Sequence, residues 1–297
     1  MNRGALTAAA EVTVVAGGAA ADGGRFPPQI RWSQAWPVVV RRTGTAEVHL
    51  VHGAGGPLGG DRFALDLALG SGAALQVRSA AATIVQPGAG DAARWSVRAA
   101  LGPAARLVWR PEPTVVCDGA ALDAELRLRL EPGAGAVLRE VVVLGRLGER
   151  GGRYRGELRV DVGGTPLLAH RTVLDGTDPA LCGPAGTAGA RAVGTVVWAG
   201  AAVPDGRLRA GAAEAPGLRW AYSELEGPGR VLLAVGEPRA VGELLDAELA
   251  AVGAAASGGD RPCGADQRSG AGQRSGGDRP PDARDVATPA ALGWRSG

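Results

Sequence analysis

A histidine and a carboxylate flank a run of glycines between His52 and Asp61, and these residue types could do chemistry together. The sequence His-Gly-Ala-Gly-Gly is compatible with the oxyanion-hole loop of a serine hydrolase. That mechanism also needs a serine in a Gly-x-Ser-x-Gly turn, and no serine of the chain lies in that frame. The glycines lack the spacing of a dinucleotide-binding loop, and the chain has no lysine for a P-loop. We therefore expect no catalysis here, and a hydrolase built on His52 and Asp61 ranks last among the interpretations.

Metal ligation is the second chemistry that the residue types allow. His49 and His52 are three residues apart, so on a strand their side chains would point to opposite faces and could not reach one ion. His170 is isolated and the chain has no Cys-x-x-Cys pair, so the spacing predicts no tight metal site and no tightly bound cofactor. A weak passage lined by carboxylates and backbone carbonyls leaves no spacing motif, so that kind of site stays open.

The segment Gly55–Asp61, Gly-Gly-Pro-Leu-Gly-Gly-Asp, lies between two strand-like runs. Glycine loses backbone entropy in regular structure and proline removes a hydrogen-bond donor, so this composition predicts a turn. It also indicates that the backbone approaches a neighbouring group closely, beside the carboxylate that ends the segment. The turn glycines are Gly55, Gly56, Gly59 and Gly60.

Composition limits the function classes. With 297 residues, 45% of them hydrophobic, the chain can bury a sizeable core. The net charge of +2 provides no strong field for nucleic acid or an anionic membrane, and no apolar run approaches the roughly 20 residues of a membrane span. The three cysteines are widely spaced and odd in number, which argues against a disulfide framework and favours a reducing, cytoplasmic location.

The dominant sequence period is two between about residues 10 and 235, which predicts half-buried strands. From Leu122 to Leu130, for example, apolar residues alternate with Asp123, Glu125 and two arginines. Three segments each combine a strand end, a Gly/Pro turn and a strand start, about 30 residues apart. They are Leu69–Leu75, Leu101–Leu107 and Leu130–Leu138. We therefore predict an all-β protein with stacked, β-helix-like layers and few helices, although a series of ordinary hairpins would give a similar pattern.

The best helix signal starts at Pro238, where apolar residues recur at helical spacing. Core packing is the usual reason for such a stripe, and the alternative is a docking surface for a helical partner. The stripe includes Val241, Leu244, Leu245 and Leu249. From residue 258 the chain consists mainly of Gly, Arg, Asp, Ser and Pro. We therefore expect one β domain over 1–257 and a disordered tail over 258–297.

The segment Arg150–Gly156, Arg-Gly-Gly-Arg-Tyr-Arg-Gly, resembles an RNA-binding patch in composition. It is a single copy flanked by Glu149 and Glu157, so a charged hairpin loop is the preferred interpretation.

Five segments, in order, resemble the family of UreD (UreH) urease accessory proteins. The first is the turn Gly55–Asp61. A Thr/Ala-rich strand follows with Thr83, and then Trp109-Arg-Pro111-Glu-Pro113-Thr114. Next is a glutamate, a short apolar strand and Gly-Arg, which here are Glu140, Val141–Leu144, Gly145 and Arg146. The last is Leu167–Asp175. The match covers about residues 10–255, and Ile84 stands where the family has a lysine.

The resemblance implies a β-helix-like scaffold without catalytic activity of its own. It also implies a role in urease maturation, in which the chain joins the urease apoprotein to the accessory proteins UreF and UreG, the latter a GTPase. Nickel in transit would be the cargo. Asp61 and then Glu140 are the candidate carboxylates of a transient nickel passage. The structural alternatives are a turn-capping side chain for Asp61 and a buried hydrogen bond for Glu140. A β-solenoid interaction protein unrelated to nickel is the main alternative for the whole chain.

Overall fold

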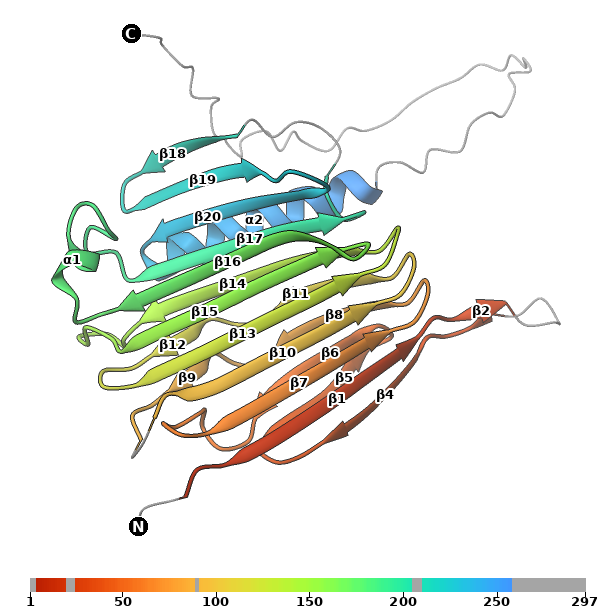
Figure 1. Ribbon diagram of the computed structural model, residues 1–297, viewed down its shortest axis with the longest axis horizontal. Helices are drawn as coiled ribbons and strands as arrows, with labels where there is room; N and C mark the ends of the chain where they lie inside the picture. Colours follow the sequence, from red (N-terminus) through yellow and green to blue (C-terminus); the bar gives the residue numbers. More distant parts are fainter. Residues whose placement is uncertain (1–3, 20–24, 89–90, 205–209, 258–297) are drawn as a thin grey trace, which may run out of the picture. The chain divides into compact units, whose positions relative to one another are not determined.

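The computed structural model describes residues 4–19, 25–88, 91–204 and 210–257 (Figure 1). These residues fall in one compact unit, Met1–Gly259. The tail expected over 258–297 lies outside the described residues.

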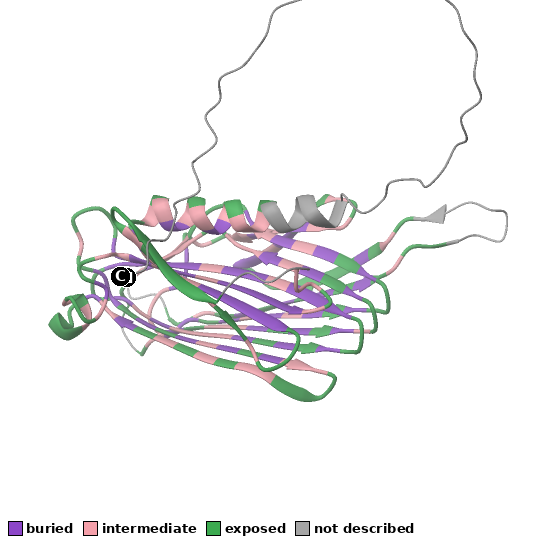
Figure 2. Ribbon diagram, turned by 90° about the horizontal axis from the view of Figure 1, so that it is seen from above, coloured by how far each residue is buried: buried purple, intermediate pink, exposed green. Residues whose placement is uncertain are grey.

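Two β-sheets are stacked face to face, and the chain passes repeatedly from one to the other (Figures 1 and 2). The first sheet has seven strands. In spatial order they are β16 (Thr165–Asp175), β15 (Arg153–Val162), β13 (Ala121–Leu130), β10 (Ala93–Leu101), β7 (Arg62–Leu69), β1 (Thr7–Val15) and β4 (Gln29–Gln34).

The second sheet has eleven strands. Its main path is β18 (Gly211–Ala215), β19 (Leu218–Glu224), β20 (Gly229–Gly236), β17 (Ala192–Gly200), β14 (Gly135–Leu144), β11 (Arg106–Arg110), β8 (Ala74–Ser79), β6 (Glu47–His52) and β5 (Val38–Gly44). Beside this path lie β9 (Thr83–Val85) and β12 (Thr114–Val116). A small separate pair is formed by β2 (Gly18–Ala19) and β3 (Arg25–Phe26).

The predicted repeat of about 30 residues corresponds to successive coils. Strands β7, β10, β13 and β15 pair in parallel in one sheet, and β8, β11 and β14 pair in parallel in the other. The Gly/Pro turns between the sheets stack as well, since Gly102 N donates to Leu69 O at 2.8 Å and Glu131 N to Leu101 O at 2.9 Å. Parallel pairing requires crossovers, so a series of hairpins does not describe this part of the chain. The all-β, β-helix-like prediction is confirmed.

The main core lies between the sheets, where the inward residues of each strand meet. Burial alternates residue by residue along β1, as the period of two predicts. Among the largest fully buried side chains are Leu65, Leu107, Leu128 and Leu138. A second apolar layer lies on the other side of the eleven-stranded sheet, under helix α2 (Pro238–Ser257). Figure 2 shows α2 covering that outer side, whereas no helix covers the outer side of the seven-stranded sheet.

Helix α2 is the helix expected from Pro238, and it continues past Gly253 to Ser257. Val241 and Leu245 are 0% exposed and pack with Val196 and Trp198 of β17. Leu244 and Leu249 are half-buried against the same cluster. The docking hypothesis is therefore corrected for Val241 and Leu245, because the sheet of this chain already covers them.

The segment 150–156 is not a hairpin loop. It runs from a loop that connects β14 with β15 into β15 itself, and these two strands belong to different sheets. The other helix, α1 (Pro179–Cys182), is a single turn capped by Asp178. No helix in the described ranges is both long and apolar enough to cross a membrane.

Candidate functional site

The turn Gly55–Asp61 follows β6 and leads into β7, and it has the tight backbone that its glycines predict. Gly55, Gly56 and Gly60 have φ values of +69°, +107° and +89°, which side chains rarely adopt. A Cβ atom on Gly56 would also collide with the carbonyl oxygen of Ile84 in β9. The glycines therefore let the turn lie directly against the neighbouring coil.

Asp61 is 1% exposed, and both of its carboxylate oxygens accept backbone hydrogen bonds. Oδ2 accepts from Leu58 N at 3.0 Å, which closes the turn, and Oδ1 accepts from Leu6 N at 2.7 Å, next to the start of β1. This geometry matches the capping alternative for Asp61. It also explains why the glycine turn ends in a carboxylate, which holds the turn and the first strand together.

A cavity of about 50 Å³ lies between the two sheets, and side chains from several coils converge on it. The predicted residues Thr83, Trp109, Pro111, Thr114 and Glu140 all line this cavity. They come from β9, β11, β12, β14 and the segment between β11 and β12, so parallel stacking of coils brings them together. Other polar side chains at the cavity are His52, Ser79 and Tyr154. Pro57 of the glycine turn also lines it, whereas Asp61 does not.

Glu140 is the carboxylate of the cavity. Its pKa is raised to about 7, because burial penalises the charged form, and the nearby Trp109 indole partly offsets this rise. Trp109 Nε1 is buried and forms no hydrogen bond with any residue that the structure describes, and the indole only partly opposes the effect of burial on the carboxyl. Near neutral pH the side chain therefore exists in both protonation states.

His52 is the histidine of the cavity, and its imidazole could ligate a metal ion. Burial lowers its pKa, so the imidazole is neutral near pH 7. Its Nδ1 is buried without a hydrogen-bond partner in the described structure, and its ring lies 5.5 Å from that of Trp95. A neutral imidazole without a partner is the form that ligates metals.

Tyr154 closes the cavity from β15, and its pKa is raised well above the usual value by burial and by the Glu140 charge. Gly156 leaves room for this ring, since a Cβ there would lie 2.5 Å from the Tyr154 hydroxyl oxygen. Sequence reasoning singled out neither Tyr154 nor Ser79. Tyr154 could have been found from the alternation along its strand, because it lies on the same inward face as Leu158 and Val160.

The cavity offers one carboxylate, one imidazole and several hydroxyls. Its volume suffices for a small number of waters or one partly hydrated cation. Across the described ranges, no cluster of three or more His, Cys, Asp or Glu residues could hold a metal ion. The carboxylate and the imidazole are residue types that contact divalent cations.

The other predicted family residues support loops. Pro113 O accepts from Thr83 N at 2.9 Å and so joins two coils next to the cavity. Gly145 has φ +70°, and Arg191 donates to the carbonyl oxygens of Gly145 and Arg146 at 2.7 and 3.0 Å. Arg146 pairs with Glu149 and lowers the pKa of that carboxyl to about 2. The contacts of Gly145 and Arg146 fix the loop between β14 and β15. Neither of these two residues nor Pro113 lines the cavity.

Comparison with known proteins agrees with the motifs. A family model described as UreD urease accessory protein matches residues 19–251. The urease accessory protein UreD of Parafrankia sp. is 41% identical over 241 residues, which cover 73% of this chain and 80% of that protein. The corresponding protein of Frankia alni is 40% identical over 215 residues, which cover 65% of this chain and 69% of that one. The chain therefore belongs to the family of UreD urease accessory proteins.

Proposed function

We propose that this chain is a urease maturation factor without catalytic activity of its own. It acts in the cytoplasm as a scaffold and nickel conduit between a UreF–UreG complex and the urease apoprotein. The observation that carries this proposal is the cavity between the sheets, which is lined by Glu140, His52 and four further residues that define the family resemblance.

Nickel is the cargo in this proposal, and Glu140 and His52 are its transient ligands. A carboxylate and an imidazole suit a divalent first-row metal, and two protein ligands leave most coordination positions to water. Such a site binds weakly, which suits transfer better than storage. The apolar strands around the cavity keep other ligands away from the ion during its passage.

Proton exchange at Glu140 would accompany the passage. Without a cation the carboxyl is partly protonated, since its pKa of about 7 reflects the cost of a buried charge. Arrival of a divalent cation favours the carboxylate and releases the proton, and departure of the cation restores it. The cavity therefore avoids holding an uncompensated charge between transfers.

Asp61 takes a different role in this proposal from the one expected from the family resemblance. Its two oxygens hold the glycine turn and the entry of β1, and the turn places Pro57 at the cavity wall. Asp61 therefore supports the shape of the passage and is not its ligand.

The test uses cells that carry the cognate urease operon, with this gene intact, deleted or encoding Glu140→Gln. Deletion should leave urease protein present but poor in nickel and inactive. Glu140→Gln should reduce the nickel content of urease at an unchanged level of the accessory protein. The matched control is Glu243→Gln, an acidic residue of α2 whose side chain is 64% exposed and lies outside the cavity.

Two results would contradict the proposal. Fully active urease after deletion would remove the maturation role and favour an interaction protein unrelated to nickel. A nickel content in Glu140→Gln cells equal to that of the control would remove the conduit and leave only the scaffold.

A further inference from the structure

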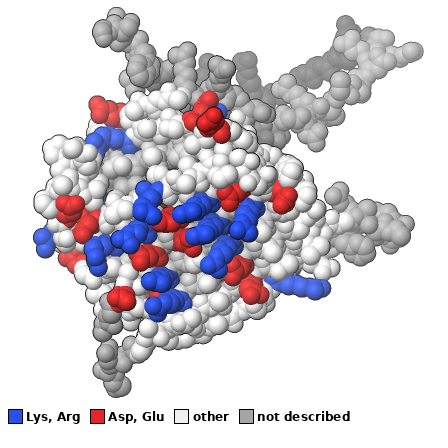
Figure 3. Space-filling model, in the orientation of Figure 1, with Lys and Arg blue, Asp and Glu red and all other residues white. Residues whose placement is uncertain are grey.

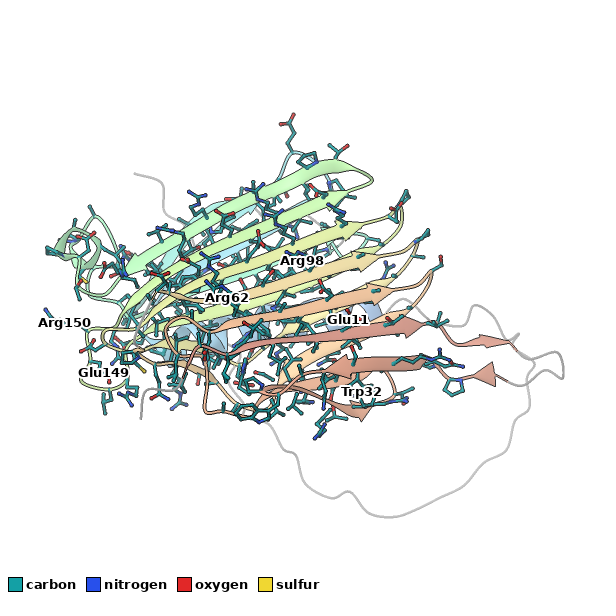
Figure 4. All side chains as sticks on the ribbon, turned by 60° about the horizontal axis from the view of Figure 1, so that its bottom comes forward. Glu11, Trp32, Arg62, Arg98, Glu149 and Arg150 are labelled. Atoms are coloured by element: carbon teal, nitrogen blue, oxygen red, sulfur yellow. The ribbon has the colours of Figure 1, made fainter. Side chains whose placement is uncertain are left out.

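The outer face of the seven-stranded sheet carries a dense array of arginines (Figure 3). Strands β7, β10, β13 and β15 direct eight of them outward, interspersed with fewer carboxylates. The arginines are Arg62, Arg94, Arg98, Arg127, Arg129, Arg153, Arg155 and Arg159. Figure 4 shows Arg62 and Arg98 on neighbouring strands of this sheet, and Glu149 and Arg150 on the loop that leads into β15.

The parallel register places like charges side by side. Arg98 pairs with Arg127 across β10 and β13, and Arg127 pairs with Arg159 across β13 and β15. Neighbouring strands lie about 4.8 Å apart, so these three guanidinium groups form one row across the sheet. Like charges at directly paired positions destabilise a sheet, so folding alone does not favour such a row.

Carboxylates on the same face only partly compensate this charge. Arg98 lies 4.0 Å from Asp66, Arg159 lies 3.5 Å from Glu157, and Arg127 pairs with Glu125. Each arginine of the row is still at least 50% exposed. Arg94 and Arg129 lie opposite Asp123 and Asp161 in the strand register, but among the described residues neither arginine forms an ion pair within 4.0 Å.

A hollow of about 370 Å³ adjoins the row and gives it a shape that a partner could enter. Its lining includes the small side chains of Ala68 and Ala100. Three arginines, Arg98, Arg127 and Arg129, also line it, together with two carboxylates, Glu11 and Asp66. Small residues beside long guanidinium groups leave space for a side chain from another molecule to reach the charges from above.

We propose that this arginine face, defined by the row Arg98, Arg127 and Arg159 and the adjoining hollow, docks an acidic surface of a protein partner in the maturation complex. The inference rests on the proposed function for the choice of partners, but not on the cavity. Arginine binds carboxylates in a bidentate manner and is frequent among the residues that dominate interface energy. Nucleic acid fits less well, because its evenly spaced phosphates require continuous positive charge, whereas a protein surface can place basic residues opposite the carboxylates that interrupt the arginines.

The test compares two triple variants of the full-length protein. The first changes Arg98, Arg127 and Arg159 to Glu, and the control changes the surface arginines Arg41, Arg42 and Arg239 to Glu. Binding to purified cognate apo-urease and, separately, to the purified UreF–UreG complex is measured at 50 and 300 mM salt. The first variant should bind one of these partners at least tenfold more weakly than both wild type and control. The affinity of the wild-type protein for that partner should fall between 50 and 300 mM salt, and the affinity of the variant should fall less.

Thermal unfolding and circular dichroism establish that both variants are folded. If charge reversal unfolds the first variant, the triple change to Gln replaces it and should still weaken binding several-fold. Wild-type affinity of the folded row variant for both partners would overturn the proposal. Loss of binding to a duplex DNA probe, with protein binding unchanged, would also overturn it and assign the face to nucleic acid. Neither failure affects the conduit, because Glu140→Gln should bind both partners normally and fail only in nickel delivery.

Discussion

Asp61 and Glu140 are both shielded carboxylates on the same β scaffold, but their surroundings differ. Asp61 accepts backbone hydrogen bonds at both oxygens, from Leu58 and Leu6. Glu140 lies at a cavity, close to one indole N–H, and its pKa rises to about 7. A shielded carboxylate is therefore a candidate for function when the protein leaves its oxygens without strong donors, and shielding alone does not distinguish the two roles.

The largest effect expected from this difference is that of Asp61→Ala on stability. The substitution leaves two backbone N–H groups near the glycine turn without their acceptor, at about 1–3 kcal/mol each. We expect the free energy of unfolding to fall by about 3 kcal/mol, measured by urea denaturation. Asp66→Ala, which changes a carboxylate that is 48% exposed on the neighbouring strand, should cost far less. A fully stable Asp61→Ala protein that no longer supports nickel delivery would reverse the assignment and make Asp61 the ligand.

Glu140→Gln should have a smaller effect, and one that depends on pH. The folded pKa of about 7 lies above the ordinary value of 4.5, so the folded protein binds the extra proton between these values. The contribution of Glu140 to stability is therefore complete below about pH 4.5 and is lost as the pH rises through 7. At pH 8 the Gln variant should exceed the wild type in stability by about 2 kcal/mol, with little difference at pH 5.

Denaturation curves at pH 5 and pH 8 measure this effect. His52 and His170, whose pKa values are lowered by burial, destabilise both proteins equally as the pH falls, so the difference between wild type and variant isolates Glu140. A constant stability difference across this range would show that Glu140 is charged throughout, and the comparison with Asp61 would fail.

The smallest effect concerns the indole beside Glu140. Trp109→Phe removes the N–H that favours the carboxylate and keeps most of the buried aromatic ring. The pKa of Glu140 should therefore rise further, which a carbon-detected NMR titration of the side-chain carboxyl would measure. An unchanged pKa would mean that the indole does not act on Glu140.

The repeating part of the fold was predictable from particular residues. Alternation over Leu122–Leu130 predicted which side chains face the core. The turns at Leu69–Leu75 and Leu101–Leu107 predicted stacked coils, and both follow from local backbone preferences. For α2 the sequence left core packing and partner docking open, because an apolar helical stripe does not reveal whether the chain's own sheet covers it. The structure shows core packing for Val241 and Leu245.

The cavity was predictable only in part. The family motifs supplied Glu140 and four of its neighbours. The sequence also singled out His52, but no local pattern placed it or Tyr154 at the same cavity as Glu140, because they come from other coils. The role of Asp61 depends on Leu6, which is 55 residues away in the sequence. Contacts of this range are set by the stacking of coils, and sequence spacing does not record them.

The most direct test of the account measures nickel delivery by Glu140→Gln and Asp61→Asn side by side. Equal amounts of each folded variant are combined with purified UreF–UreG, Ni²⁺ and apo-urease, and the nickel bound to urease is determined by mass spectrometry. The account predicts that Glu140→Gln delivers much less nickel than wild type, whereas Asp61→Asn, which keeps one acceptor oxygen, delivers nickel at nearly the wild-type level. The opposite order of the two variants would contradict the claim that the cavity carboxylate lies on the path of the metal.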